Sequence, residues 1–150
     1  MRHLAALLLL LTFGSVQAQA EAPEATLLGR INTFRAAEGL AGLAPDPTLT
    51  DLAERHLREM VAGGYFAHCS PNGRCLAERL RAAGYEARLW AENLAAGFTD
   101  PHATLAAWQA SPEHRANLLR AGASAAGIAY APQRIEGMRG LWVLVVAAPR

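Results

Sequence analysis

The segment "LWVLVVA" (residues 141–147) is apolar at every position and not at alternate ones. A half-buried strand alternates apolar and polar residues, so a continuously apolar strand is expected to be covered on both of its faces. "GIAYA" (residues 127–131) precedes it, and the loop "PQRIEGMRG" joins the two. This pattern predicts an antiparallel hairpin at the end of the chain, with helices on both sides of the sheet.

Helical patterns fill most of the remaining chain. Apolar residues recur at helical spacing in "ATLLGRINTFRAAEG", and Asp-Pro pairs at 46–47 and 100–101 are typical of helix starts. Shorter helices are expected near residues 76–84 and after Ser111-Pro112, and a further strand at "YEARLW" (residues 85–90). We therefore predict an α+β fold: a three-layer α-β-α sandwich around a small, mostly antiparallel sheet.

The N-terminus indicates export. Residues 1–20 combine Arg2, an apolar run over residues 4–11 and an Ala-Gln-Ala end, which is the pattern of a cleaved signal peptide. The run is shorter than the ~20 residues of a membrane span. Residues 21–26 are expected to be a loose leader before one domain over residues 27–150. The expected location is periplasmic or secreted, with no membrane span.

The charges are balanced. All 14 basic side chains are arginine, and without Arg2 they equal the 13 acidic ones. This gives no electrostatic case for nucleic acid as a partner, and the arginines are interpreted as scattered surface residues.

Both cysteines lie in "HCSPNGRC" (residues 68–75), around the turn formers Pro71, Asn72 and Gly73. In an exported protein an even cysteine count favours a disulfide between Cys69 and Cys75. The alternative is a zinc site made of both cysteines and His68, which lacks the usual C-x-x-C spacing.

Four other polar residues stand in suggestive places: His68, Glu78, Glu92 and His114. Glu92 follows an apolar stretch, so its carboxylate needs a partner. His56 lies on the apolar side of its helix, where a core-edge histidine with one hydrogen bond is expected. These residues alone leave open whether there is a shared His/Glu site or a set of unrelated structural roles.

The ordered segments "GYFAHCSPNG", "AENLAAGF", "SPEHRANLL" and "GIAYA" resemble the CAP superfamily of cysteine-rich secretory, antigen-five and pathogenesis-related proteins, in its compact bacterial branch. The resemblance implies an α-β-α sandwich with a cleft of two histidines and two acidic residues. Carried over by motif, these are His68, His114, Glu92 and, as the weakest match, Glu78.

In some members of the superfamily this cleft binds a divalent cation such as zinc, so we expect zinc at His68 and His114, with Glu92 as a further candidate ligand, and a small or lipidic ligand beside it. The alternative function is a metal-assisted hydrolase acting on peptide or envelope material, although there is no H-E-x-x-H motif. A third hypothesis treats the polar cluster as purely structural. We expect a monomeric binding protein rather than an enzyme.

Overall fold

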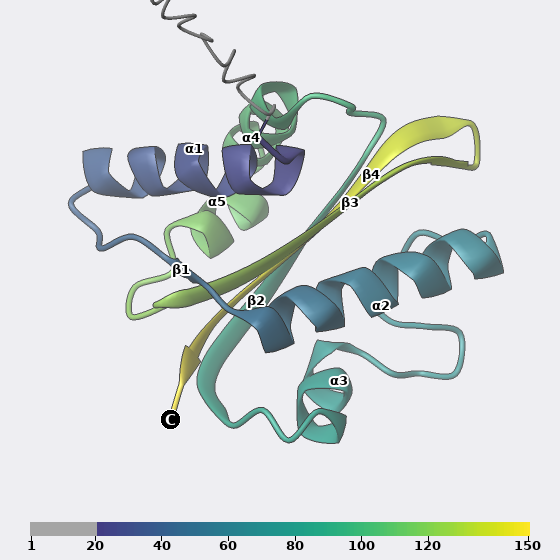
Figure 1. Cartoon of the computed structure of the whole chain (residues 1–150), viewed down its shortest axis with the longest axis horizontal. Helices are drawn as coiled ribbons and strands as arrows, with labels where there is room; N and C mark the ends of the chain where they lie inside the picture. The colour runs from purple at the N-terminus through teal and green to yellow at the C-terminus, as the bar shows by residue number, and fades with distance from the viewer. Residues whose placement is uncertain (1–20) are drawn as a thin grey trace, which may run out of the picture.

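The structure, a computed structural model, describes residues 21–150, so the signal peptide predicted over residues 1–20 lies outside the described residues. Helices cover both faces of one four-stranded sheet (Figure 1). This confirms the predicted α+β sandwich. The helices are α1 (Pro23–Ala37), α2 (Pro47–Gly63), α3 (Leu76–Ala82), α4 (Pro101–Ala110) and α5 (Pro112–Leu118), and the strands are β1 (Ala44–Pro45), β2 (Ala87–Ala96), β3 (Ala125–Ile135) and β4 (Met138–Pro149).

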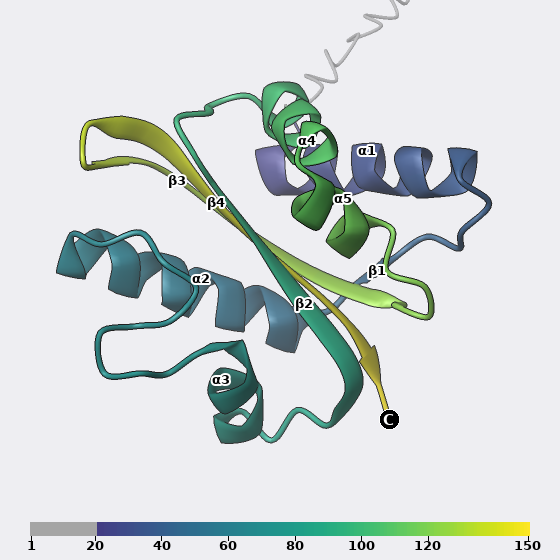
Figure 2. The same ribbon diagram turned by 180° about the vertical axis from the view of Figure 1, so that it is seen from behind.

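The central strand β4 explains the layers. Its side chains alternate between two apolar clusters, because successive residues of a strand point to opposite faces. Leu141, Val143 and Val145 join the cluster beneath α2 and α3, whereas Trp142 and Leu144 join the cluster beneath α1, α4 and α5. Figures 1 and 2 show these two groups of helices on opposite sides of the sheet. The apolar run of residues 141–147 is therefore buried on both faces, as predicted.

The sheet has the order β1-β3-β4-β2. β3 and β4 form the predicted antiparallel hairpin, and β2 pairs antiparallel with the other side of β4. β1 is parallel to β3 and pairs only with Ala125 and Ala126. Farther along β3 the register with β4 shifts between Ala131 and Arg134, around Pro132.

Helix α2 lies directly on β3 at a glycine. A Cβ added to Gly127 would lie 2.1 Å from the backbone carbon of Leu49, so the close approach of helix and strand requires glycine there. The helix begins at Asp46, whose Oδ1 accepts hydrogen bonds from the backbone N–H groups of Thr48 and Leu49. Tyr85 donates to the other oxygen of Asp46 at 3.1 Å.

Three sequence expectations need correction. Helix α1 begins at Pro23, so most of the predicted leader over residues 21–26 is its first turn, since proline is well suited to a first helical position. Strand β2 covers Ala87–Ala96 rather than residues 85–90, so the predicted strand began two residues early and ended six residues early. Arg35 and Arg79 are buried, so not every arginine is a surface residue.

The buried Arg35 ties helix α1 to the connection that follows α5. Its guanidinium donates hydrogen bonds to the backbone oxygens of Ala41, Leu118 and Ala123 at 2.8–3.2 Å. A charged group can be buried at this point because carbonyl oxygens surround it. Arg35 is therefore a structural residue that joins three segments of chain.

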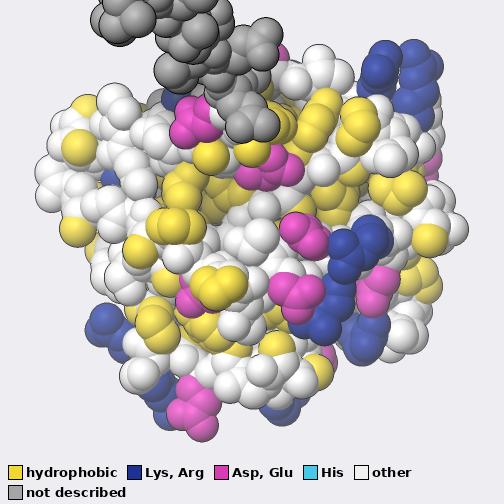
Figure 3. All heavy atoms as spheres, viewed as in Figure 1, with side chains coloured by type: hydrophobic (Ala, Val, Ile, Leu, Met, Phe, Trp, Pro, Cys, Tyr) yellow, Lys and Arg dark blue, Asp and Glu magenta, His cyan; other side chains and the backbone are white. Residues whose placement is uncertain are grey.

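Charged side chains are distributed over the surface. On the face shown in Figure 3, acidic and basic groups are interspersed and form no continuous basic stripe. None of the helices within residues 21–150 has the length and hydrophobicity needed to cross a membrane.

Candidate functional site

Strand β2 carries the central carboxylate of the site. Glu92 points to the same face as Trp90, because residues two apart in a strand share a face. Its side chain is only 4% exposed, and both of its oxygens are bonded: Oε1 lies 2.9 Å from Nδ1 of His68, and Oε2 lies 2.8 Å from a guanidinium nitrogen of Arg79. The expected partner of the Glu92 carboxylate is thus supplied by two side chains.

Arg79, which sequence reasoning missed, holds the site from helix α3. The nitrogen Nη2 that donates to Glu92 also donates to the backbone oxygen of His68, at 3.0 Å. One guanidinium therefore fixes both the carboxylate and the backbone of the histidine that binds it. The signal was present in the sequence: Arg79 lies three residues after Leu76 and next to Leu80, on the apolar side of a short helix.

The hydrogen bond with Glu92 selects the tautomer of His68. A carboxylate oxygen can only accept, so Nδ1 of His68 carries the proton. In the neutral ring, Nε2 then keeps its lone pair. The His68 side chain is 55% exposed.

The cysteines form the predicted disulfide, Cys69–Cys75, with their Cα atoms 4.1 Å apart. The bridge closes the loop between His68 and the first residue of α3, Leu76. A backbone hydrogen bond from Ser70 to the oxygen of Arg74 spans the same loop. The position of His68 is thus tied to the helix that carries Arg79.

Helix α5 supplies the second histidine. His114 is half-buried, and its backbone oxygen accepts a hydrogen bond from the Asn93 side chain at 3.0 Å. Burial lowers the pKa of His114, the charge of His68 lowers it further, and Glu113 partly offsets both effects. Both burial and the charge of His68 favour the neutral form of His114.

Glu78 has a structural contact. Its Oε2 accepts a hydrogen bond from the backbone N–H of Cys75 at 3.1 Å, which caps the start of helix α3. Within residues 21–150 no hydrogen bond joins Glu78 to His68, Glu92 or His114. Its participation in ligand binding stays a prediction.

His56 is the core-edge histidine that the sequence predicted. It is buried and makes one hydrogen bond, from Nε2 to the backbone oxygen of Ala67 at 2.9 Å. Burial lowers the pKa of His56, as does the nearby charge of Arg79. The ring is neutral at physiological pH and supports the turn that precedes His68.

A cavity of about 410 Å³ opens beside this polar cluster, and His68, Trp90, Glu92, Asn117 and Arg120 are among the residues that line it. Asn117 closes one side by donating hydrogen bonds to the backbone oxygen of Glu92 and to the side chain of Asn93. In the part of the chain that the structure describes, no three His, Cys, Asp or Glu side chains are grouped as metal ligands.

Comparison with known proteins identifies the family of this chain. The sequence profile of the CAP (cysteine-rich secretory protein) family matches residues 28–146. The chain belongs to the CAP family. The predicted resemblance is confirmed, and the match includes both histidines, both acidic residues and the disulfide loop.

The relatives of this CAP chain include longer proteins. It is 29% identical over 119 residues to the protein YkwD of Bacillus subtilis (strain 168). The aligned region covers 79% of this chain but only 46% of YkwD. It is 30% identical over 105 residues to the membrane protein YlbC of the same organism, which covers 70% of this chain and 30% of YlbC. The chain therefore spans less than half the length of these curated relatives.

Solved structures show the same fold. An extracellular protein containing a SCP domain from Bacillus anthracis str. Ames matches with a TM-score of 0.75 and 27% identity, over 84% of this chain and 40% of that one. An outer surface protein of Borrelia burgdorferi matches with a TM-score of 0.76 and 20% identity, over 84% of this chain and 92% of that one. The second likeness bears on the fold alone.

Proposed function

We propose that this CAP domain is an exported binding protein whose His68 and His114 hold a divalent cation, with zinc as the first candidate. The observation that carries the proposal is the hydrogen bond between Nδ1 of His68 and Glu92. A carboxylate that binds one nitrogen of a histidine fixes the tautomer and aims the other nitrogen at a metal. Zinc also accepts imidazole nitrogen as a ligand and leaves positions open in sites of this kind.

The surroundings of the histidines support the same function. Metal ligation requires neutral imidazole, and the lowered pKa of His114 favours that form. Glu92 acts as the orienting group rather than as a third ligand, because Arg79 and His68 already bond both of its oxygens. The cavity of about 410 Å³ beside His68 offers room for a small or lipidic ligand next to the ion.

Binding is favoured over hydrolysis for a related reason. A metal-assisted hydrolase needs a carboxylate or imidazole free to take a proton from water. Glu92 is committed to Arg79 and His68, and Glu78 caps helix α3. We therefore keep the hydrolase as the alternative and assign no catalytic residue.

Zinc binding by the exported protein tests the proposal. Isothermal titration with zinc is expected to show one site, and a His68→Ala, His114→Ala double variant is expected to lose it. The matched control is His102→Ala, since His102 is exposed in the first turn of α4. Glu92→Gln is expected to weaken zinc binding by about 10- to 100-fold, the usual effect of removing an orienting carboxylate.

Thermal unfolding of the same proteins without zinc separates binding from a structural role. If the double variant retains as much zinc as the unmodified protein, the metal proposal is wrong. If it loses zinc but unfolds at the same temperature as the His102→Ala control, the cluster is a ligand site rather than a structural one. A large loss of stability without zinc would favour the structural hypothesis instead.

A further inference from the structure

Trp90 is the one large apolar side chain that the structure leaves exposed within residues 21–150, at 41%. The other two tryptophans, Trp108 and Trp142, are at most 1% exposed, and each donates its indole N–H to a backbone oxygen. An exposed indole offers a flat apolar surface whose covering by a ligand is favourable. Tryptophan is also over-represented at the centres of binding surfaces.

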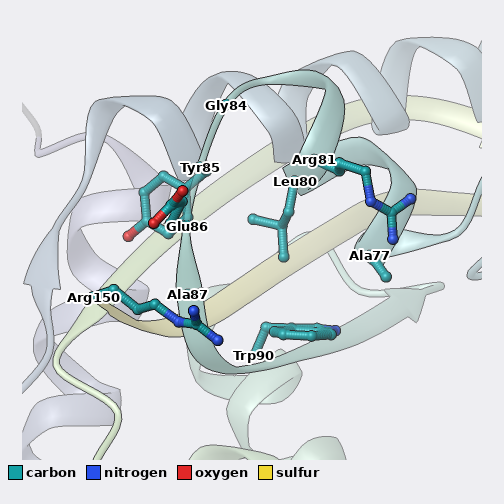
Figure 4. A pocket seen from close by; sticks show the side chains of 9 residues that line it. All are labelled: Ala77, Leu80, Arg81, Gly84, Tyr85, Glu86, Ala87, Trp90 and Arg150. Carbon is teal, nitrogen blue, oxygen red and sulfur yellow. The ribbon is translucent and has the colours of Figure 1, made fainter.

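The indole lies in a pocket whose lining includes neither histidine, although Trp90 also lines the cavity beside His68. This pocket, about 380 Å³ in volume, is formed between α3, the start of β2 and the end of β4. Figure 4 shows the ring of Trp90 along the floor of the pocket, with Leu80 above it and the guanidinium groups of Arg81 and Arg150 on either side. The volume lies within the range of small-molecule binding pockets.

Both arginines are available to a ligand. Arg81 has its nearest carboxylate, that of Glu78, at 3.8 Å, and its side chain is 75% exposed. No ion pair of the Arg150 side chain is found among the described residues, and its backbone N–H donates to the oxygen of Glu86 at 3.1 Å, which continues the pairing of β4 with β2. The pocket is therefore flanked by two guanidinium groups, one without an ion pair among the described residues and one with a long, exposed pair to Glu78.

We infer that the Trp90 pocket, flanked by Arg81 and Arg150, binds a saccharide whose ring carries a carboxylate. Guanidinium groups bind carboxylates with two parallel hydrogen bonds. The apolar C–H face of a pyranose ring would cover the indole, while its hydroxyl groups could donate to the carboxylate of Glu86, which also lines the pocket. A sugar acid needs all three features: a flat apolar floor, cationic flanks and an acceptor.

Two other anionic ligands fit less well. A fatty acid needs a continuous apolar path for its tail, and here charged side chains stand on both sides of the indole. A nucleic acid needs an extended basic surface, whereas the chain has 14 basic and 13 acidic residues.

The pocket also shares Ala77 and Trp90 with the cavity beside His68, so a longer saccharide could extend from one to the other.

Tryptophan fluorescence of the exported protein provides the test, because Trp90 alone is exposed. The probe is trigalacturonic acid, and the matched neutral ligand is galactotriose. Trigalacturonic acid is expected to change the emission with a saturable dependence, whereas galactotriose is expected to bind at least about tenfold more weakly. Trp90→Ala is expected to remove the fluorescence change, and titration calorimetry of that variant is expected to show at least about tenfold weaker binding.

Arginine variants test the carboxylate. Arg81→Gln and Arg150→Gln are each expected to weaken binding of trigalacturonic acid by about five- to tenfold, while Arg30→Gln, an exposed arginine on helix α1, leaves it unchanged. Far-ultraviolet circular dichroism checks that every variant is folded. The His68→Ala, His114→Ala variant is expected to bind the acid as the unmodified protein does, so this inference can fail or stand independently of the metal proposal.

Several results would overturn the inference. These are equal affinity for the acidic and neutral trisaccharides, unchanged affinity in both arginine variants, or no binding of trigalacturonic acid up to about 10 mM. Tighter binding of decanoate or of a single-stranded oligonucleotide at the same pocket would also overturn it, by assigning the site to a different class of ligand.

Discussion

Arg79→Met is expected to lower the free energy of unfolding by about 3–5 kcal/mol. The variant would leave the carboxylate of Glu92, 4% exposed, without its buried cation. Replacing the partner as well, in Arg79→Met, Glu92→Gln, removes the buried charge and is expected to recover part of that loss. Urea denaturation monitored by circular dichroism measures the free energy of unfolding of the unmodified protein and of both variants.

An exposed pair provides the control. Arg58 and Glu54 lie one helical turn apart on α2 and are both at least half exposed. Arg58→Met is therefore expected to change stability by no more than about 0.5 kcal/mol. Similar losses in Arg79→Met and Arg58→Met would contradict the role assigned to the buried pair.

The stability of the fold is expected to decrease as the pH falls below about 6.5, the ordinary pKa of histidine. Burial, reinforced by Arg79, lowers the pKa of His56 in the folded protein. Between that lowered value and the ordinary one, the unfolded chain binds more protons than the folded chain, so acid favours unfolding. Above about pH 6.5 the stabilisation that comes from keeping His56 neutral is fully present. It is lost as the pH falls from about 6.5 through the lowered pKa of the folded protein.

Urea denaturation between about pH 5 and pH 8 measures this dependence. His56→Gln is expected to flatten the curve, because glutamine does not titrate and can still donate to Ala67. The pKa of His114 is lowered too, so some slope is expected to remain. A slope that is the same in the variant and in the unmodified protein would show that His56 does not cause it.

The pairing of His68 with Glu92 was accessible to sequence reasoning, whereas the role of Arg79 was missed although its place on the apolar side of a short helix could be read from the sequence. A carboxylate after an apolar stretch requires a partner, and the CAP resemblance pointed to His68. Arg79 looked like one more surface arginine, because its long side chain can reach either solvent or the protein interior from the same backbone position. Only the packing of α3 against β2 decides between the two.

At the level of elements, Gly127→Ala is expected to destabilise the protein by more than about 3 kcal/mol, as overpacking does where a backbone cannot move away. The added Cβ would lie 2.1 Å from the backbone of Leu49, so helix α2 would have to shift away from β3. Thermal unfolding is expected to show a markedly lower midpoint.

Gly29→Ala is the matched substitution. Gly29 lies inside helix α1, and a Cβ there would meet nothing within 4 Å. Alanine is expected to raise stability by about 0.5–1 kcal/mol through its greater helix propensity. If Gly127→Ala were as stable as the unmodified protein, the close packing of α2 on β3 would be wrong.

Strand β2 shows where local sequence is insufficient. Residues 91–96, "AENLAA", are mostly good helix formers, yet they form a strand because they pair residue by residue with β4. Helix α2, in contrast, was predictable at both ends, from Asp46-Pro47 at its start and the two glycines at its end. A capped helix is encoded locally, whereas a strand depends on its neighbour.

For the whole molecule, the two apolar clusters are expected to unfold together. Leu141 lies in the cluster beneath α2 and α3, and Leu144 lies in the cluster beneath α1, α4 and α5. Leu141→Ala and Leu144→Ala are each expected to cost about 2–5 kcal/mol, because both side chains are at most 1% exposed. In both variants, near- and far-ultraviolet circular dichroism should report one common transition.

Leu28→Ala is the control, because Leu28 is only partly buried on α1. Its loss of unfolding free energy is expected to be smaller than that of Leu141→Ala or Leu144→Ala. Two separate transitions, with each variant shifting only one, would contradict a single cooperative unit.

The layered architecture itself was predictable from one observation, the uninterrupted apolar run of β4. The burial of Arg35 and Arg79 within those layers was not predictable, because their hydrogen-bond partners are distant in the sequence.

The outer edge of β3 bears on aggregation at high protein concentration. Beyond Ala126 this edge has no strand beside it among the described residues, and a bare edge can recruit other chains into mixed sheets. Pro132 has no amide hydrogen to donate, and the pairing register with β4 shifts between Ala131 and Arg134, as at a β-bulge. Both devices act against aggregation, so the protein should stay dispersed at high concentration.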